Sequence, residues 1–177
     1  MKKRCGLIII LALLSLCGCG AEKANTATIA NPWTDSDEKG VLEATGFDLV
    51  APEGATDVIY SYMEEAKMAQ VTYNLENASW VYRVKPANSL EDISGMNYEW
   101  KYSENGTVSG REAVYMAWSD AAENAEYIDS TQSVQVVNWY DVVPGVTYSL
   151  SASGTDLNGM DIQVFAEQLF VPLQGES

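Results

Sequence analysis

Ser36 and Lys39 stand three positions apart, the Ser-x-x-Lys spacing in which a lysine activates a serine nucleophile. The Ser-Asp-Asn and Lys-Thr-Gly motifs that accompany this pair in penicillin-binding proteins are missing from the chain. The chain also has no His, which removes the usual general base near neutral pH and the usual metal ligand. We therefore expect this segment to begin a helix, and we expect a protein that is not an enzyme and uses no cofactor.

Two acidic segments resemble places where a cation binds. Asp35 and Asp37 stand two positions apart with Gly40 following, as in the first half of a calcium loop, but Lys39 and Gly46 stand where two of the later ligands belong. The segment 156–161 is a second acidic turn, and a turn before a helix needs no metal to explain it. We expect no metal site at either segment.

Trp and Tyr residues are spread over most of the predicted strands. Both side chains have a polar tip and tolerate partial exposure, so neighbouring rings can line a sheet face on which sugars or peptides stack. The same rings can instead fill the core beneath helices and support one another across strands. Both alternatives stay open, and the candidate ligand-binding aromatic residues are Trp80, Tyr82, Trp100, Trp118 and Trp139.

The pattern of apolar residues predicts the elements that carry these rings. A short helix is expected around residues 34–46 and strands around 47–52, 56–64, 68–76 and 78–86. Further strands are expected on both sides of an Asn105-Gly106 turn and of a Pro144-Gly145 turn.

A C-terminal amphipathic helix of about three turns is expected after Asn158, because apolar residues from Ile162 to Leu169 recur at helical spacing. The expected fold is α+β. It consists of a twisted, mostly antiparallel sheet of about six or seven strands, with a short N-terminal helix and the C-terminal helix packed on one face.

The N-terminus resembles a secretory signal, with three basic residues, an apolar run of about a dozen residues and small residues near its end. The sequence Leu-Cys-Gly-Cys that closes this run resembles a bacterial lipobox, which implies that Cys19 is lipidated and becomes the new N-terminus. An ordinary cleaved signal is the alternative. The predicted organisation is a signal peptide over 1–18, a flexible tether over 19–32, a single domain over 33–172 and a tail over 173–177.

Removal of the signal leaves 7 Lys and Arg against 25 Asp and Glu, a formal net charge of −18. Such a surface repels nucleic acid and anionic lipid, so we expect no nucleic-acid partner. The lipid on Cys19 would then supply the attachment to the cell membrane. The predicted location is extracytoplasmic.

Several segments together resemble a family of uncharacterised lipoproteins of Gram-positive gut bacteria, similar to the sheet-plus-helix ectodomains of anti-sigma-factor-like membrane proteins. They include "TGFDLVAPEGA", "MAQVTY", "WYDVVPGVTYSLS" and "FAEQLF". The resemblance implies the fold and a surface location, and it carries over no catalytic residue. We expect a non-catalytic module that senses a ligand or binds a cell-surface protein. The alternatives are a glycan-binding module and, third, a glycoside hydrolase, whose paired carboxylates the sequence cannot place.

Overall fold

The computed structural model describes residues 31–119, 132–155, 157 and 159–172. The expected signal peptide, Cys19, nearly all of the expected tether and the expected tail 173–177 lie outside these residues. One compact unit spans Asn31–Ser177 and contains every described helix and strand and both hydrophobic clusters. Because a unit with its own core can fold alone, this fragment suits experiments on the isolated domain.

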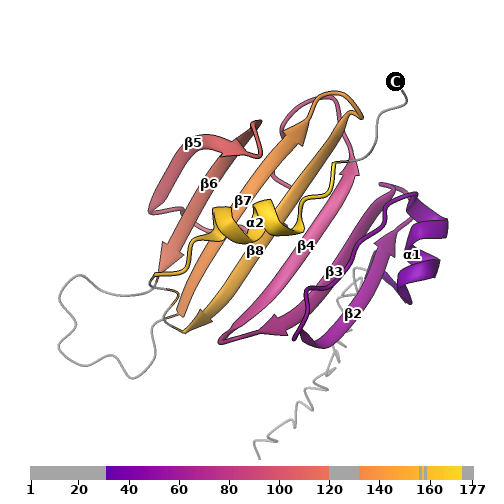
Figure 1. Cartoon of the computed structure of the whole chain (residues 1–177), viewed down its shortest axis with the longest axis horizontal. Coiled ribbons are helices and arrows are strands. Elements are labelled where there is room, and N and C mark those ends of the chain that lie inside the picture. Colours follow the sequence, from indigo (N-terminus) through magenta and orange to yellow (C-terminus); the bar gives the residue numbers. More distant parts are fainter. Residues whose placement is uncertain (1–30, 120–131, 156, 158, 173–177) are drawn as a thin grey trace, which may run out of the picture. The chain divides into compact units, whose positions relative to one another are not determined.

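An antiparallel sheet of eight strands forms the body of this unit, in the order β1-β2-β3-β4-β8-β7-β6-β5 (Figure 1). The β4–β8 step alone joins strands that are not consecutive, so the sheet consists of two four-stranded meanders lying side by side. The strands are β1 Thr34–Ser36, β2 Thr56–Met63, β3 Met68–Leu75, β4 Ala78–Pro86, β5 Tyr102–Val108, β6 Arg111–Ser119, β7 Gln132–Asp141 and β8 Val146–Thr155. A sheet-dominated α+β fold is confirmed, whereas the expected six or seven strands are corrected to eight.

The two helices are short, and each is capped by an aspartate. Helix α1 spans Glu38–Thr45, and the Asp37 carboxylate accepts a hydrogen bond from the Gly40 N–H at 2.7 Å. Helix α2 spans Ile162–Leu169, and Asp161 accepts from the Gln163 N–H at 3.0 Å. Asp161 therefore caps α2 in place of the predicted Asn158, and α2 is eight residues long rather than about three turns.

The helices do not form a joint layer over the sheet as expected. Helix α1 packs on β1, β2 and β3, whereas α2 packs on β5, β7 and β8 (Figure 1). Between them, the extended segment 47–53 covers part of the same hydrophobic core, with Phe47 and Leu49 buried. We call this side of the sheet the helix face; the side chains that it presents include Tyr73, Tyr82 and Tyr148.

The opposite side of the sheet, the loop face, is covered by the irregular segment 87–101 that connects β4 to β5. The Arg83 guanidinium donates to the carbonyl oxygens of Ile93 (3.0 Å) and Ser94 (2.6 Å) and lies 5.0 Å from the centre of the Trp33 ring. Farther along the sheet, a second small core contains Met116, Val134 and Val136. Both faces are therefore covered in part, because the long connection supplies apolar and polar contacts where no helix is present.

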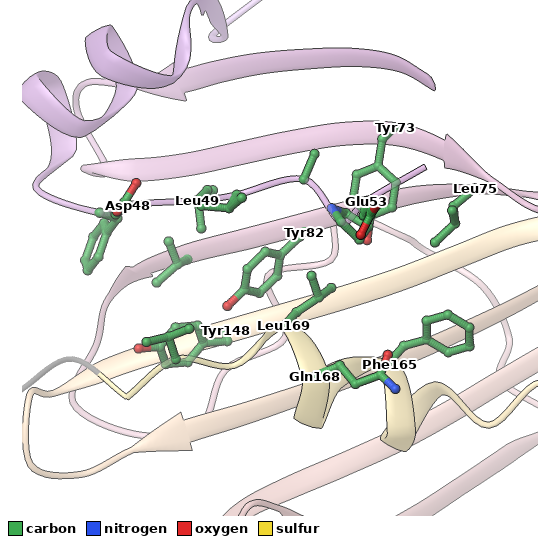
Figure 2. Close-up of a pocket in the computed structure, with 16 residues that line it drawn as sticks. Asp48, Leu49, Glu53, Tyr73, Leu75, Tyr82, Tyr148, Phe165, Gln168 and Leu169 are labelled. Carbon is green, nitrogen blue, oxygen red and sulfur yellow. The ribbon is translucent and has the colours of Figure 1, made fainter. Parts of the chain in front are cut away.

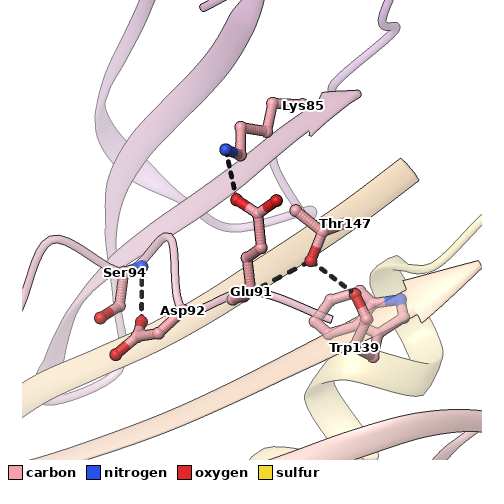
Figure 3. A network of polar contacts seen from close by, with 6 residues as sticks. All are labelled: Lys85, Glu91, Asp92, Ser94, Trp139 and Thr147. Atoms are coloured by element: carbon pink, nitrogen blue, oxygen red, sulfur yellow. Dashed lines mark hydrogen bonds and ion pairs between the residues drawn. The ribbon is translucent and has the colours of Figure 1, made fainter. Parts of the chain in front are cut away.

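Figure 3 shows how the same segment is fixed to β4 and β8 by polar contacts. The Lys85 ammonium group lies 2.6 Å from the Glu91 carboxylate, and the Asp92 carboxylate accepts from the Ser94 N–H at 2.9 Å. The buried Thr147 hydroxyl donates to the Trp139 carbonyl oxygen at 3.2 Å, with the Glu91 carbonyl oxygen 3.4 Å away. These side-chain contacts, together with backbone hydrogen bonds at the two ends of the segment (Ala87 N–H to Gly145 O and Lys101 N–H to Ala117 O), give the irregular chain a defined path.

One turn lies elsewhere than predicted. Asn105 and Gly106 are inside β5, and the turn between β5 and β6 falls at Ser109 and Gly110, whose φ angles are +47° and +79°. Two consecutive positive φ angles are the requirement of a two-residue type I′ hairpin. Gly106 is needed for a different reason: a Cβ there would lie 2.6 Å from the Tyr115 ring, which packs over the glycine. The Pro144-Gly145 turn is confirmed between β7 and β8.

Candidate functional site

The five candidate aromatic residues do not share a face. Trp80, Tyr82 and Trp139 are buried on the helix face, with 1%, 4% and 0% of their surface exposed. Trp100 and Trp118 are half-buried and pack on the loop face. Three of the rings therefore belong to the main core and the other two lie on the opposite side of the sheet, so the five rings do not line one common face.

The buried rings form a ladder across three neighbouring strands. Tyr82 on β4 and Tyr148 on β8 lie with ring centroids 6.4 Å apart and planes 14° apart. Trp139 on β7 continues the ladder, 5.1 Å from Tyr148 and nearly parallel to it at 6°. Parallel planes arise because the three side chains leave the same face of adjacent strands, and such cross-strand pairs stabilise a sheet.

Two phenylalanines attach α2 and the residue after it to these rings. Phe165 packs on Trp80 with centroids 4.6 Å apart, and Phe170 lies edge-on to Trp139 (6.0 Å) and Tyr148 (5.2 Å). The Arg111 guanidinium lies 4.7 Å from the centre of the Phe170 ring and pairs with the Asp141 carboxylate at 3.3 Å. The helix is thus held at its middle and at its end.

Between segment 47–53 and α2 the helix face is left open, and a cleft of about 520 Å³ forms there. We call it the tyrosine cleft. Figure 2 shows Tyr82 at its centre, with Leu49 on one side and Leu169 on the other. Its lining consists of Phe47, Asp48, Leu49, Val50, Ala51, Pro52, Glu53, Tyr73, Leu75, Tyr82, Val84, Tyr148, Phe165, Gln168, Leu169 and Val171.

The tyrosine hydroxyls of the cleft are neutral hydrogen-bonding groups. Burial raises the pKa of Tyr73 and of Tyr82 far above the usual value, and for Tyr82 the neighbouring tyrosines add to the effect. Burial is also the main cause that raises the pKa of Tyr148 to about 12. In the part of the chain that the structure describes, none of these three hydroxyls has a hydrogen-bond partner, and that of Tyr148 is fully buried.

The rim of the cleft carries the charge. Asp48 and Glu53 are exposed, and neither has an ion pair or hydrogen bond within the described residues. The opposite wall presents the amide of Gln168, and none of the described residues that line the cleft is Lys or Arg. The cleft therefore combines an apolar interior, unpartnered hydroxyls and a negative rim.

The loop face holds a second group of rings. Tyr98 stacks on Trp118 with centroids 4.7 Å apart and meets Trp100 edge-on at 5.6 Å. Tyr98 is 39% exposed, and both tryptophans are half-buried. We call these three residues the loop-face aromatic cluster; it brings together two of the five candidate residues.

The other residues that the sequence singled out are the Ser36–Lys39 pair and the two acidic segments. The Lys39 ammonium group lies 3.5 Å from the Glu43 carboxylate on the same helix, and Asp37 is occupied as the helix cap. Asp156 and Asn158 lie outside the described residues. Among the residues that the structure does describe, no three of His, Cys, Asp and Glu lie close enough together to hold a metal ion.

Of the residues that line the tyrosine cleft, Tyr82 alone was a candidate binding residue from the sequence. The residues 47–52 were expected to form a strand, and Phe47 and Leu49 do alternate with the exposed Asp48 and Val50 as in a strand. The segment nevertheless pairs with no strand and crosses the helix face instead. Its period of two was the available signal, since an extended wall and a paired strand bury alternate residues in the same way.

No helix in the described ranges has the length and apolar character to cross a membrane. No protein-family model, no curated protein and no solved structure matches the chain.

Proposed function

We propose that this protein is a non-catalytic module that binds a small, largely apolar ligand in the tyrosine cleft. The observation that carries the proposal is the open cleft itself, about 520 Å³ in volume and lined mainly by apolar side chains and tyrosines. Small-molecule sites have volumes of roughly 300 to 1,000 Å³ and combine apolar walls with a few polar groups. The cleft has this size and this composition.

The tyrosines on the floor of the cleft are better suited to binding a ligand than to catalysis. The raised pKa values of Tyr73 and Tyr82 keep both hydroxyls protonated at neutral pH. A general base or nucleophile needs a pKa near the working pH, so these hydroxyls act as hydrogen-bonding groups. Without a partner among the described residues, they favour a ligand that supplies one.

The binding domain is proposed to act at the outside of the cell membrane. The basic start, the apolar run and the lipobox resemblance at Cys19 support a lipid anchor. The resemblance to lipoproteins of Gram-positive gut bacteria supports the same location. A ligand bound in the cleft would then be taken from the extracytoplasmic medium or the membrane surface.

A fluorescence titration of the fragment Asn31–Ser177 with N-phenyl-1-naphthylamine, a neutral apolar dye, tests the proposal. We expect saturable binding at one site. Gln168 is exposed at the mouth of the cleft, so Gln168→Trp narrows the entrance and should lower the dye affinity by about tenfold or more. Val164→Trp, on the same helix and outside the cleft lining, is the control and should bind as the unmodified fragment does. Dye binding that is absent, or unaffected by Gln168→Trp, would contradict the proposal.

A glycan-binding surface is the second candidate, favoured by the loop-face aromatic cluster. Partly exposed tryptophan and tyrosine rings offer faces on which sugar rings stack. A pull-down with insoluble bacterial cell walls tests it. If glycans bind there, Trp118→Ala abolishes retention of the fragment, whereas Gln168→Trp leaves it unchanged.

A further inference from the structure

We propose that the ligand of the tyrosine cleft carries a cationic ammonium group on an apolar body. This inference rests on the proposed function and adds the chemical class of the ligand. It follows from the charges of the lining: both charged side chains are carboxylates, Asp48 and Glu53. Neither is neutralised by a partner among the described residues, so both are available to a ligand.

The two carboxylates lie on the same wall. Both belong to segment 47–53, which borders the cleft on the side away from α2, as Figure 2 shows for Asp48 and Glu53. The facing wall contributes the uncharged Gln168 together with Phe165 and Leu169. A ligand lying in the cleft would thus have its charged end beside segment 47–53 and its apolar part against α2.

The tyrosines on the floor of the cleft also favour a cationic ligand. Ammonium groups are attracted by the faces of tyrosine rings, and Tyr73 and Tyr82 supply two such rings. Their hydroxyl oxygens can also accept hydrogen bonds from an N–H donor, and neither oxygen accepts one from the described part of the chain. The floor therefore offers a cation ring faces and hydroxyl oxygens, in addition to the carboxylates at the rim.

An anionic ligand would be disfavoured. A fatty-acid carboxylate in the cleft would lie near Asp48 and Glu53 with no Lys or Arg among the described lining residues to compensate it. The chain as a whole has a formal net charge of −15, which adds to the repulsion. A neutral ligand would gain from the apolar walls alone.

Three probes with eight carbons in a linear chain separate these cases: octylammonium, octanol and octanoate, titrated calorimetrically into the fragment Asn31–Ser177 at neutral pH and low ionic strength. We expect the cation to bind about tenfold or more tightly than octanoate, with octanol between them. Binding of octanoate as tight as that of the cation would overturn the inference.

The rim is tested by the double variant Asp48→Asn/Glu53→Gln, whose exposed positions should leave the fold intact. The double variant should bind the cation with about fivefold lower affinity, and its affinity for octanol should be unchanged. Glu112→Gln, an exposed carboxylate on β6 outside the cleft, is the matched control and should have no effect. An unchanged cation affinity in the double variant would overturn the inference.

The two proposals fail differently. Octanol and octanoate could bind as tightly as the cation, with Gln168→Trp lowering the affinity for all three probes. In that case the cleft binds apolar molecules, and only the proposed preference for a cation is wrong. If none of the probes binds, or Gln168→Trp affects none of them, the cleft is not the binding site and both proposals are wrong.

Discussion

Phe165 of α2 rests on Trp80 of β4, with ring centroids 4.6 Å apart and planes 41° apart. Trp80 in turn stacks on Tyr73, whose ring lines the floor of the tyrosine cleft. The contact therefore joins the helix that forms one wall of the cleft to the sheet that forms its floor. Stability and ligand binding are both expected to depend on it.

Replacement of this ring tests that coupling. Phe165→Ala should lower the free energy of unfolding by about 1 to 3 kcal/mol, because the contact with Trp80 and part of the core cover are lost. Urea unfolding monitored by tryptophan fluorescence measures the change. Val164→Ala is the control at the preceding residue, which is 46% exposed, and should cost less than about 0.5 kcal/mol. Equal losses in the two variants would show that the ring does not anchor α2.

The hydroxyl of Tyr148 is expected to contribute nothing to stability, since it is buried with no hydrogen-bond partner. Tyr148→Phe should leave the free energy of unfolding unchanged or raise it by up to about 1 kcal/mol. Tyr115→Phe is the matched comparison, because the Tyr115 hydroxyl donates to the Thr107 carbonyl oxygen at 2.7 Å. That variant should lose about 1 kcal/mol. Thermal and urea unfolding compare the two; a loss at Tyr148 as large as that at Tyr115 would contradict the assignment.

Alkaline pH should destabilise the fold. Burial raises the pKa of Tyr148 from the ordinary tyrosine value of about 10 to about 12, so the folded state holds that proton more tightly than the unfolded state does. The stabilising effect is complete below about pH 10 and is lost as the pH rises through about 12. For Tyr148 alone the loss approaches about 2 kcal/mol near pH 11.5. Urea unfolding from pH 8.5 to 11.5 should show a smaller decline for Tyr148→Phe, and identical declines would count against the buried hydroxyl.

The lipid anchor is tested by replacing Cys17 and Cys19 with serine, each in a separate variant. Cys19→Ser should abolish incorporation of an alkyne-labelled fatty acid into the protein expressed in a Gram-positive host and release it from the membrane fraction. Cys17→Ser keeps the lipidated sulfur and should leave labelling and membrane association intact. Labelling that survives in Cys19→Ser would contradict the lipobox interpretation.

The β3–β4 hairpin and helix α1 could be predicted from the sequence because their signals are local. More and less buried residues alternate along most of β3 and β4, and α1 lies between its caps Asp37 and Gly46. The prediction of a turn at Asn105-Gly106 was wrong, because a glycine beneath the Tyr115 ring has the same sequence signature as a glycine in a turn. Local signals cannot tell these two uses apart.

The candidate site could not be predicted from the alternation of residues along single strands. Alternation correctly places Trp80 and Tyr82 on one face of β4, but it does not say what covers that face. The cover comes from distant and irregular chain: α2 and segment 47–53 on the helix face, and segment 87–101 on the loop face. Trp139 pairs with Ala113 and Trp118 pairs with Val134, so the register between β6 and β7 puts the two rings on opposite sides, and alternation within one strand does not give that register.

The binding of a cationic apolar ligand in the tyrosine cleft is tested most directly by mapping the backbone amide chemical shifts of the ¹⁵N-labelled fragment Asn31–Ser177 during titration with octylammonium. We expect saturable changes confined to segment 47–53, the residues around Tyr73 and Tyr82, and residues 165–171 at and after the end of α2. Changes concentrated at Tyr98, Trp100 and Trp118 would move the binding site to the loop face and contradict the account, as would the absence of any saturable change.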